Sequence, residues 1–448
     1  MKPSTLAQLT NRKLLLVLAY APAGLGHLRV TDALYHGLPE TVNPVVLGSQ
    51  DTSIQSIHRL TSVNPVGKAI FDWLQGGPYS EQSNKLYRDS LRANHRDIYD
   101  QMTRLLTERL ERPEKILVAC THFGLAHKLA AIKDELQQRE RVHMVLAVCV
   151  TDDTFQHIWY IDGADVLVVP SQYTKRKYVE YGQHMGNMLR IEVVPYPLHP
   201  RLAEKLDEAQ LAAKTRQLDP NSPEPIHVSI PISGAAVGTA YFSALMAGLR
   251  ERSERFLFHI VCKDAPFTQD FLSELAGQAW IDVRAGKEDR EVVDSYDVLM
   301  ETQTVALEVT KPSEQTFKCL ASTGSRGGVV LLFTHPVGTQ EFENMDFLRR
   351  HALVPSSETN DQLWAMAADS ARIDAALLSR LLKESCLWRG VRIPSDPQQA
   401  AGFIWWMQTS GFFSRMLAGN LDRKVQDEES RVLGADGVAE FWDLATSV

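Results

Sequence analysis

Short apolar runs alternate with amphipathic segments along most of the chain. In the first half, runs of Val, Leu and Ile predict strands at 13–20, 44–48, 115–120, 142–150, 165–170 and 191–195. Segments with helical periodicity separate them, at 25–38, 84–111, 123–138 and 173–182. Because the apolar runs are continuous and do not alternate with polar residues, we expect strands buried on both faces, as in a parallel sheet covered by helices.

The pattern pauses at 200–224, a polar stretch that ends in DPNSPEP and predicts a linker or a surface hairpin. It then restarts, with strands expected at 226–232, 256–262, 280–284, 305–310 and 329–334, and helices at 236–252, 289–302, 314–322 and 340–352. Beyond about 357 the pattern is mainly helical. Two such series in 448 residues predict two doubly wound α/β domains, placed at 1–200 and 201–370, with a helical C-terminal extension at 371–448.

The net charge of the chain indicates which classes of molecule it is expected to bind. A net charge of −8 argues against a nucleic-acid partner. Residues 1–200 hold 22 Lys and Arg against 20 Asp and Glu, a net of +2, and the remainder carries −10, so an anionic ligand would more readily meet the N-terminal half. The N-terminal residues lack a signal-peptide apolar core, and no apolar run reaches the roughly 18–20 residues of a membrane span. We therefore expect a cytoplasmic protein that at most attaches to the inner face of a membrane.

The five cysteines form no C-x-x-C pair, so no metal site is expected from them. Cys120, Cys149 and Cys262 end apolar runs. They are expected to be buried thiols in a reducing compartment.

A glycine-containing turn joins the first strand to the first helix. Gly24 and Gly26 would let the backbone turn tightly and approach a ligand, to which the helix start presents free N–H groups. His27 stands at that helix start, where a neutral imidazole could accept a proton from a hydroxyl. The alternative is that His27 only hydrogen-bonds the loop.

Polar residues also follow two later strands of the first series. They are Thr121 and His122 after one strand, and Asp152, Asp153, His157 and Trp159 after the next. Because the carboxyl ends of parallel strands meet at one edge of a sheet, these residues are expected to line a ligand cleft there. The alternatives are a polar helix cap for Thr121 and His122, and a turn cap for Asp153.

The second series offers comparable loops. Ser233 and Gly234 follow its first strand and open a helix, which predicts a second phosphate cradle. Lys311, after another strand, either meets a phosphate or is an ordinary surface charge. Gln340 and Glu341 could hydrogen-bond sugar hydroxyls.

Taken in order, these segments resemble the motifs of one glycosyltransferase family, which includes monogalactosyldiacylglycerol synthase, processive diacylglycerol glucosyltransferases and the muramyl-pentapeptide N-acetylglucosaminyltransferase. The resemblance runs from about residue 13 to 355. It is most specific in the segment with Val150, Thr151, Asp152, His157, Trp159, Asp165, Pro170, Ser171 and Gly182. Other matches are Gly24–His27, Pro195–Pro200, Ser233–Gly234, Val261–Cys262, Thr310–Pro312 with Thr316, and Gly338, Gln340, Glu341 and Asn344.

The resemblance implies a GT-B fold, in which two Rossmann-like domains face each other across a cleft and C-terminal helices pack back. It implies transfer, with inversion, of a hexose or N-acetylhexosamine from a UDP-linked donor to an acceptor hydroxyl, without a metal or cofactor. The catalytic candidates are then His27 and Asp152. The donor-binding candidates are Gly24, Gly26, Ser233, Gly234, Lys311, Pro312, Glu314, Thr316, Gln340 and Glu341. The acceptor-side candidates are Thr121, His122, His157 and Trp159.

The departures from the family pattern all lie in the donor half. Ser313 and Glu314 stand where the family has two glycines, and Cys319 stands where it usually has a glutamate that grips the donor ribose. Such a carboxylate contributes about 1.5–3 kcal/mol through charged hydrogen bonds, and Glu314 could replace it. These departures keep two alternatives open, a sugar-nucleotide epimerase or hydrolase on the same fold and an inactive binding protein.

The acceptor is expected to be a small molecule or a lipid. In lipid-glycosylating relatives the region matching 58–112 meets the membrane. The residues that could do so here are Phe71, Trp73, Leu74 and Tyr79, with Lys68, Arg88, Arg92 and Arg96. The favoured alternative is an ordinary helical layer that packs on the sheet. The aromatic segment 403–417 is likewise expected to pack across the domains, the other interpretation being an interfacial helix.

Overall fold

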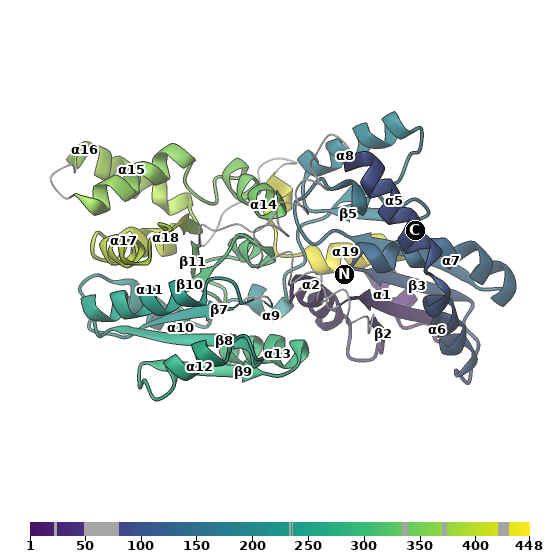
Figure 1. Ribbon diagram of the computed structural model, residues 1–448, viewed down its shortest axis with the longest axis horizontal. Helices are drawn as coiled ribbons and strands as arrows, with labels where there is room; N and C mark the ends of the chain where they lie inside the picture. The colour runs from purple at the N-terminus through teal and green to yellow at the C-terminus, as the bar shows by residue number, and fades with distance from the viewer. Residues whose placement is uncertain are drawn as a thin grey trace. The chain divides into compact units, whose positions relative to one another are not determined.

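A computed structural model describes residues 1–21, 25–48, 80–232, 234, 236–333, 339–369, 374–419 and 430–448. The chain forms two compact units. The first contains Met1–Pro200, Gly338–Gln340 and Asp427–Val448, and the second contains Arg201–Val337 and Glu341–Gln426. Each unit has its own parallel sheet and its own helices (Figure 1).

The first unit is built on a six-stranded parallel sheet in the order β2-β1-β3-β4-β5-β6. The strands are β1 (Leu14–Tyr20), β2 (Val45–Gly48), β3 (Lys115–Cys120), β4 (His143–Cys149), β5 (Val166–Val169) and β6 (Ile191–Val193). The register of β1 on β3 pairs Leu14 with Lys115 and ends at Ala19 with Cys120, so these two strands end together. The central strands are buried on both faces, which confirms the parallel sheet that their uniform apolar runs predict.

The helices of the first unit follow the predicted pattern with two exceptions, an unpredicted helix at Pro3–Leu9 and a break within 84–111. They are α1 (Pro3–Leu9), α2 (Leu25–His36), α5 (Ser80–Ala93), α6 (Arg96–Thr107), α7 (Phe123–Glu140), α8 (Gln172–Met185), α19 (Gly437–Thr446) and the 3-10 turns η1 (His157–Trp159) and η5 (Ser430–Leu433). The prediction of one helix at 84–111 is wrong, because the helix breaks between Ala93 and Arg96. There the Asn94 side chain donates to the Ser90 carbonyl and competes with the helical backbone bonds.

The second unit has a six-stranded parallel sheet in the order β12-β11-β10-β7-β8-β9. Its strands are β7 (Ile226–Pro231), β8 (Phe256–Lys263), β9 (Ile281–Gly286), β10 (Leu307–Thr310), β11 (Val329–Leu332) and β12 (Gly390–Arg392). Numbered from β7, this is the 3-2-1-4-5-6 order of the Rossmann fold. The prediction of two doubly wound α/β domains is therefore confirmed. Among the described strands, β12 was not predicted, because Val391 is its single strongly apolar residue, between Gly390 and Arg392.

The helices of the second unit include three that were not predicted, at Pro200–Ala203, Glu208–Leu218 and Gln269–Leu275. The set is α9 (Pro200–Ala203), α10 (Glu208–Leu218), α11 (Thr239–Arg252), α12 (Gln269–Leu275), α13 (Asp289–Thr302), α14 (Thr339–Arg350), α15 (Ser357–Ala368), α16 (Ala375–Glu384), α17 (Pro397–Thr409), α18 (Phe412–Ala418) and the 3-10 turns η2 (Glu314–Leu320) and η4 (Ser385–Leu387). The helix expected at 314–322 is thus a 3-10 helix.

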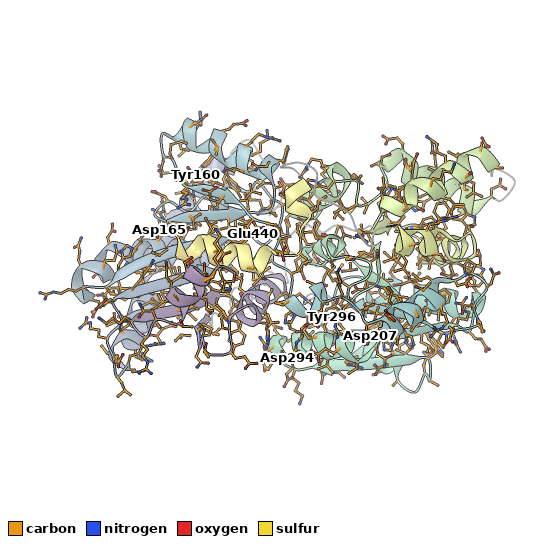
Figure 2. The ribbon with its side chains drawn as sticks, turned by 180° about the vertical axis from the view of Figure 1, so that it is seen from behind. Tyr160, Asp165, Asp207, Asp294, Tyr296 and Glu440 are labelled. Atoms are coloured by element: carbon orange, nitrogen blue, oxygen red, sulfur yellow. The ribbon has the colours of Figure 1, made fainter. Side chains whose placement is uncertain are left out.

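The stretch 200–224 is helical at Pro200–Ala203 and Glu208–Leu218, is not a hairpin, and belongs to the second unit from Arg201 onward. Asp207, labelled in Figure 2, begins α10 with a capping box, in which its carboxylate accepts from the Gln210 backbone N–H at 2.8 Å. Lys214 and Leu218 of this helix are buried. The polar composition of the stretch reflects this N-terminal cap and the exposed helix face.

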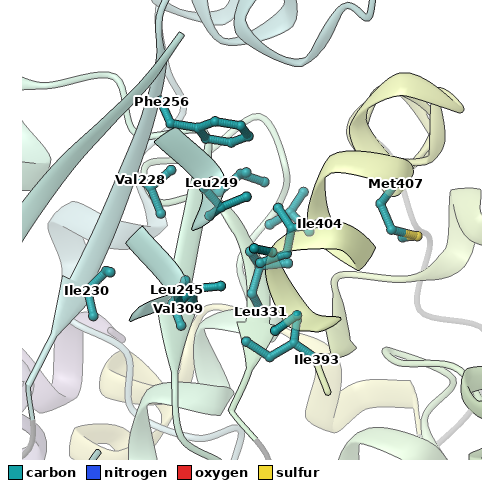
Figure 3. Close-up of a cluster of buried hydrophobic side chains, with 14 of the residues drawn as sticks. Val228, Ile230, Leu245, Leu249, Phe256, Val309, Leu331, Ile393, Ile404 and Met407 are labelled. Carbon is teal, nitrogen blue, oxygen red and sulfur yellow. The ribbon is translucent and has the colours of Figure 1, made fainter. Parts of the chain in front are cut away.

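The core of the second unit includes residues from beyond position 400. Phe256 on β8, Leu249 on α11 and Ile404 on α17 lie in the same cluster of buried apolar side chains (Figure 3). Helix α17 packs on α11, so the aromatic segment 403–417 forms part of this core. Helices that follow the two βα series therefore pack back onto them.

Helix α19 returns to the first unit. The Trp442 indole N–H donates to the Leu34 carbonyl at 3.0 Å, and both Trp442 and Phe441 are fully buried. The Asp443 carboxylate accepts from the Lys2 backbone N–H at 2.7 Å and the Thr5 hydroxyl at 2.6 Å, which joins α19 to α1. The region 371–448 is thus shared between the two units.

Cys120, Cys149 and Cys262 are buried free thiols, as predicted from the apolar runs that they end, and Cys319 is buried as well. Burial raises the pKa of Cys120, Cys149 and Cys319 to about 12, so these thiols stay protonated. Within the described part of the chain, no helix has both the length and the apolar character to cross a membrane.

Candidate active site

His27 lies at the carboxyl edge of the first unit's sheet. It is the third residue of α2, which follows β1, and it contacts the segments that follow β3 and β4. Its Nδ1 atom is 2.7 Å from the Thr121 carbonyl oxygen and 3.2 Å from the Thr151 hydroxyl. The parallel register brings these three chain segments to one edge, as the sequence predicts.

The Thr121 carbonyl determines which nitrogen of His27 carries the proton. A carbonyl oxygen only accepts hydrogen bonds, so the neutral imidazole carries its hydrogen on Nδ1. The lone pair is then on Nε2, the nitrogen that can accept a proton. Thr31, one turn along α2, holds this arrangement, since its hydroxyl donates to the His27 carbonyl at 2.8 Å and lies 2.7 Å from the Thr121 hydroxyl.

Two aromatic side chains enclose His27. The His122 ring meets it edge to face, with centroids 4.9 Å apart, and the Trp159 ring is tilted at 6.1 Å. Both are buried. His122 is also the N-cap of α7, where its Nδ1 accepts from the Leu125 backbone N–H at 3.4 Å. The helix-cap interpretation of His122 is therefore confirmed, and its ring still lies beside His27.

The two neighbouring aspartates after β4 occupy different environments. Asp153 is buried, and its Oδ1 accepts from the hydroxyls of Ser171 at 2.5 Å and Thr174 at 2.7 Å. Since Ser171 caps α8, Asp153 has the structural role that was the alternative interpretation. Asp152 is half-buried in the same bend and remains the candidate of the pair for contact with a ligand.

His157 lies farther along, in η1. Its ring stacks on Tyr181 with centroids 4.1 Å apart. The Arg88 guanidinium donates to the His157 carbonyl at 3.3 Å, and Arg92 donates to the Asp162 carbonyl at 2.6 Å. These two basic side chains of α5 therefore bind the protein itself, as expected for a helical layer on the sheet. Phe71, Trp73, Leu74, Tyr79 and Lys68 lie outside the described residues.

In the second unit, Lys311 follows β10 and pairs with Glu341 near the start of α14. The Lys311 ammonium is 2.5 Å from a Glu341 carboxylate oxygen, and the carboxylate is nearly fully buried. The amide of Asn344 reaches the Pro312 carbonyl at 3.4 Å and ties the same loop to α14. Lys311 is therefore an ion-paired residue with 20% of its side chain exposed, and not an isolated surface charge.

The other donor-side candidates differ in how deeply they are buried. Thr316 is fully buried, and its hydroxyl donates to the Ser313 carbonyl at 2.7 Å inside η2. Glu314 and Gln340 are half-buried, as are Gly26, the second residue of α2, and Gly234, which lies in a turn. Gly24 and Ser233 lie outside the described residues. At Cys319 the protonated, buried thiol offers no carboxylate to a ribose.

A buried charge network around Glu308 was not predicted from the sequence. Glu308 on β10 is fully buried and accepts from Lys318 at 2.5 Å and from the Tyr296 hydroxyl at 2.8 Å. Burial raises the pKa of Glu308, but the charge and hydrogen bonds of Lys318 outweigh this and leave the pKa below its ordinary value. The available signal was a glutamate inside the apolar run VALEVT. Tyr296 of α13 is labelled in Figure 2.

No known family profile matches the chain, and no curated protein matches its sequence. Among solved structures, it is similar to UDP-GlcNAc 2-epimerase from Neisseria meningitidis bound to UDP-GlcNAc, with 9% identity, coverage of 97% of this chain and 99% of that chain, and a TM-score of 0.46. It is also similar to Acinetobacter baumannii MurG, with 9% identity, coverage of 97% and 99%, and a TM-score of 0.44.

A third similar structure is Arabidopsis thaliana UGT89C1 complexed with UDP, with 14% identity, coverage of 98% of this chain and 95% of that chain, and a TM-score of 0.42. Because all three TM-scores lie below 0.5, the function proposed below rests on the residues of this chain.

Proposed function

We propose that the protein is a glycosyltransferase that moves a hexose or N-acetylhexosamine from a UDP-linked donor to an acceptor hydroxyl, with inversion and without a metal. One observation carries the proposal. The contact between His27 Nδ1 and the Thr121 carbonyl leaves Nε2 as a proton acceptor at the edge of the sheet where α/β proteins bind ligands. The resemblance of the surrounding motifs to sugar transferases supplies the reaction class.

His27 is the base in this proposal. Nε2 removes the proton of the acceptor hydroxyl as its oxygen attacks the anomeric carbon, and the bond from that carbon to the diphosphate breaks. The imidazolium that forms is stabilised because its Nδ1–H already points at the Thr121 carbonyl. Trp159 and His122 limit the orientations of the ring. Asp152, in the bend that follows β4, is the second catalytic candidate, and Thr121 and His157 are the acceptor-side candidates.

The second unit holds the donor in this proposal. Glu341 accepts hydrogen bonds from the sugar hydroxyls, and the Lys311 ammonium holds the buried Glu341 carboxylate in position. Glu314 takes the ribose contact that Cys319 cannot make. The acceptor is a small molecule or a lipid, and the reaction is placed in the cytoplasm.

The test is a panel of UDP-, GDP-, TDP- and ADP-linked sugars, read first by thermal unfolding. A donor at about 100 times its Kd stabilises the folded protein by about 2.7 kcal/mol. Release of the nucleoside diphosphate is then followed with and without small-molecule and lipid acceptors. Acceptor-dependent release supports the proposal.

Three other outcomes contradict the proposal. Turnover without any acceptor indicates an epimerase or hydrolase. Binding without turnover indicates a binding protein. The absence of binding by every member of the panel contradicts the nucleotide-sugar site itself.

A further inference from the structure

A second cluster of side chains lies farther along α2 and is not used by the proposed transfer. Asp32 and His36 are four residues apart on this helix, and His199 comes from the segment before α9. One nitrogen or oxygen from each of the three lies within 4.8 Å of the others. All three residues belong to the first unit.

The distances in this cluster suit ligands that share a metal ion. The Asp32 Oδ1 atom is 3.5 Å from His36 Nε2, and the Asp32 Oδ2 atom is 3.6 Å from His199 Nε2. These separations are longer than the roughly 2.7–3.2 Å of a direct N–H···O hydrogen bond. Each is close to the roughly 3.3 Å that separates two ligand atoms of a tetrahedral ion with bonds of about 2.0–2.1 Å, and each histidine faces a different oxygen of Asp32.

The chemistry and burial of the three side chains point the same way. Two imidazole nitrogens and one carboxylate form a donor set typical of zinc and similar divalent ions, and three protein ligands leave a position for water. The Asp32 and His199 side chains are 1% and 7% exposed, which would hold the ion rigidly. The His36 side chain is 31% exposed, which gives an ion a route from solvent.

We propose that Asp32, His36 and His199 form a binding site for one Zn²⁺-type ion in the first unit. The pair at i and i+4 on α2 supplies two ligands from one helix face, and the third comes from a distant part of the sequence. The ion would fasten the segment that ends at Pro200 to α2. This site is separate from the base His27 and does not depend on the proposed function.

The experiment uses untagged, chelator-treated full-length protein titrated with Zn²⁺, and with Co²⁺ as a spectroscopic probe. We expect one high-affinity ion per chain, visible Co²⁺ absorption bands of a tetrahedral site, and a higher melting temperature with metal. H36A, the variant at the most exposed ligand, is expected to lower the affinity at least about tenfold. H199Q should do the same.

The matched control is H184A, which removes an exposed histidine in the last turn of α8 and should leave binding unchanged. Melting without metal shows whether each variant is folded. The proposal is overturned if the wild type binds no ion at micromolar Zn²⁺, or if the H36A/H199Q double variant binds as tightly as the wild type. Donor binding is measured in parallel, so failure of the metal site is distinguishable from failure of the transferase proposal.

Discussion

The polar contacts of His27 in the first unit are with carbonyl and hydroxyl groups, whereas the polar side chains around β10 of the second unit form ion pairs. His27 is held by the carbonyl of Thr121 and the hydroxyl of Thr151. In the second unit Lys311 pairs with Glu341 and Lys318 with Glu308, and both carboxylates are buried. A neutral imidazole can accept a proton without first breaking an ion pair, and fixed ion pairs hold buried carboxylates in position. The difference suits proton transfer in one unit and grip of a polar ligand in the other.

The largest expected effect concerns His27 in the first unit. His27→Ala should lower the rate of sugar transfer about 10²–10⁴-fold, because it removes the general base. Donor-induced thermal stabilisation should be unchanged. His143→Ala, which removes an exposed histidine at the start of β4, is the control for both measurements. Transfer that persists at a comparable rate in His27→Ala would show that His27 is structural.

The next largest effect concerns the buried ion pair of Glu308 with Lys318 in the second unit. Glu308→Gln should lower the free energy of unfolding by about 3–5 kcal/mol, because it leaves the Lys318 ammonium buried without its carboxylate. Urea unfolding measures this loss. Asp294→Asn, at the exposed pair with Arg290, is the matched control and should change stability by less than about 1 kcal/mol. Equal effects of the two substitutions would contradict the importance of burial.

The dependence of stability on pH should show the contribution of buried His127. Burial lowers the pKa of His127 to about 4, while its Nε2–H donates to the Ile158 carbonyl at 2.9 Å. The unfolded chain therefore binds more protons between pH 6.5 and 4, and the stability that His127 preserves at neutral pH is lost as the pH falls through that window, by up to about 3 kcal/mol. His127→Gln should remove this part of the acid sensitivity in urea midpoints, and His184→Gln should retain it.

Donor affinity should respond to the Lys311–Glu341 pair. Lys311→Met removes the charge that faces the buried Glu341 carboxylate. Since hydrogen bonds to charged groups contribute about 1.5–3 kcal/mol, we expect the donor Kd to rise about 10–100-fold. Isothermal titration with the best donor of the panel measures the change. An unaltered Kd would remove Lys311 and Glu341 from the donor site.

The smallest effect concerns a motif residue that the structure buries. Thr316→Val removes the hydroxyl that bonds the Ser313 carbonyl, and should cost about 0.5–1.5 kcal/mol of unfolding free energy. Because this hydroxyl is used within η2, the donor Kd should not change. A large loss of donor affinity with unchanged stability would instead place Thr316 against the ligand.

The sequence was most informative where burial is uniform. Strands such as β3 and β7 read as continuous apolar runs because helices cover both faces of the sheet, and both begin at the predicted residue. The prediction of a linker or hairpin at 200–224 is wrong because the Asp207 capping box begins a helix within this polar segment. The break between helices α5 and α6 near Asn94 depends on one local hydrogen bond, which leaves little trace in the hydrophobic periodicity of the sequence.

In the candidate site, likewise, some contacts could be predicted from the sequence and others could not. His27, Thr121 and Thr151 were expected at one edge because parallel strands bring their carboxyl ends together. The ion pair of Lys311 with Glu341, thirty residues apart, follows from how α14 packs beside the end of β10, which no periodicity reveals. The tautomer of His27 likewise depends on a backbone carbonyl, a group that every residue carries.

The return of α19 to the first unit has a consequence for the order in which the protein matures during translation. Trp442 and Phe441 complete the packing of a domain whose other strands and helices lie almost entirely within the first 200 residues. A ribosome would release the whole second unit before it delivers these two side chains. The first unit, although made first, would then be the last to acquire its full set of contacts, and it would depend on chaperones for longer than its position in the chain suggests.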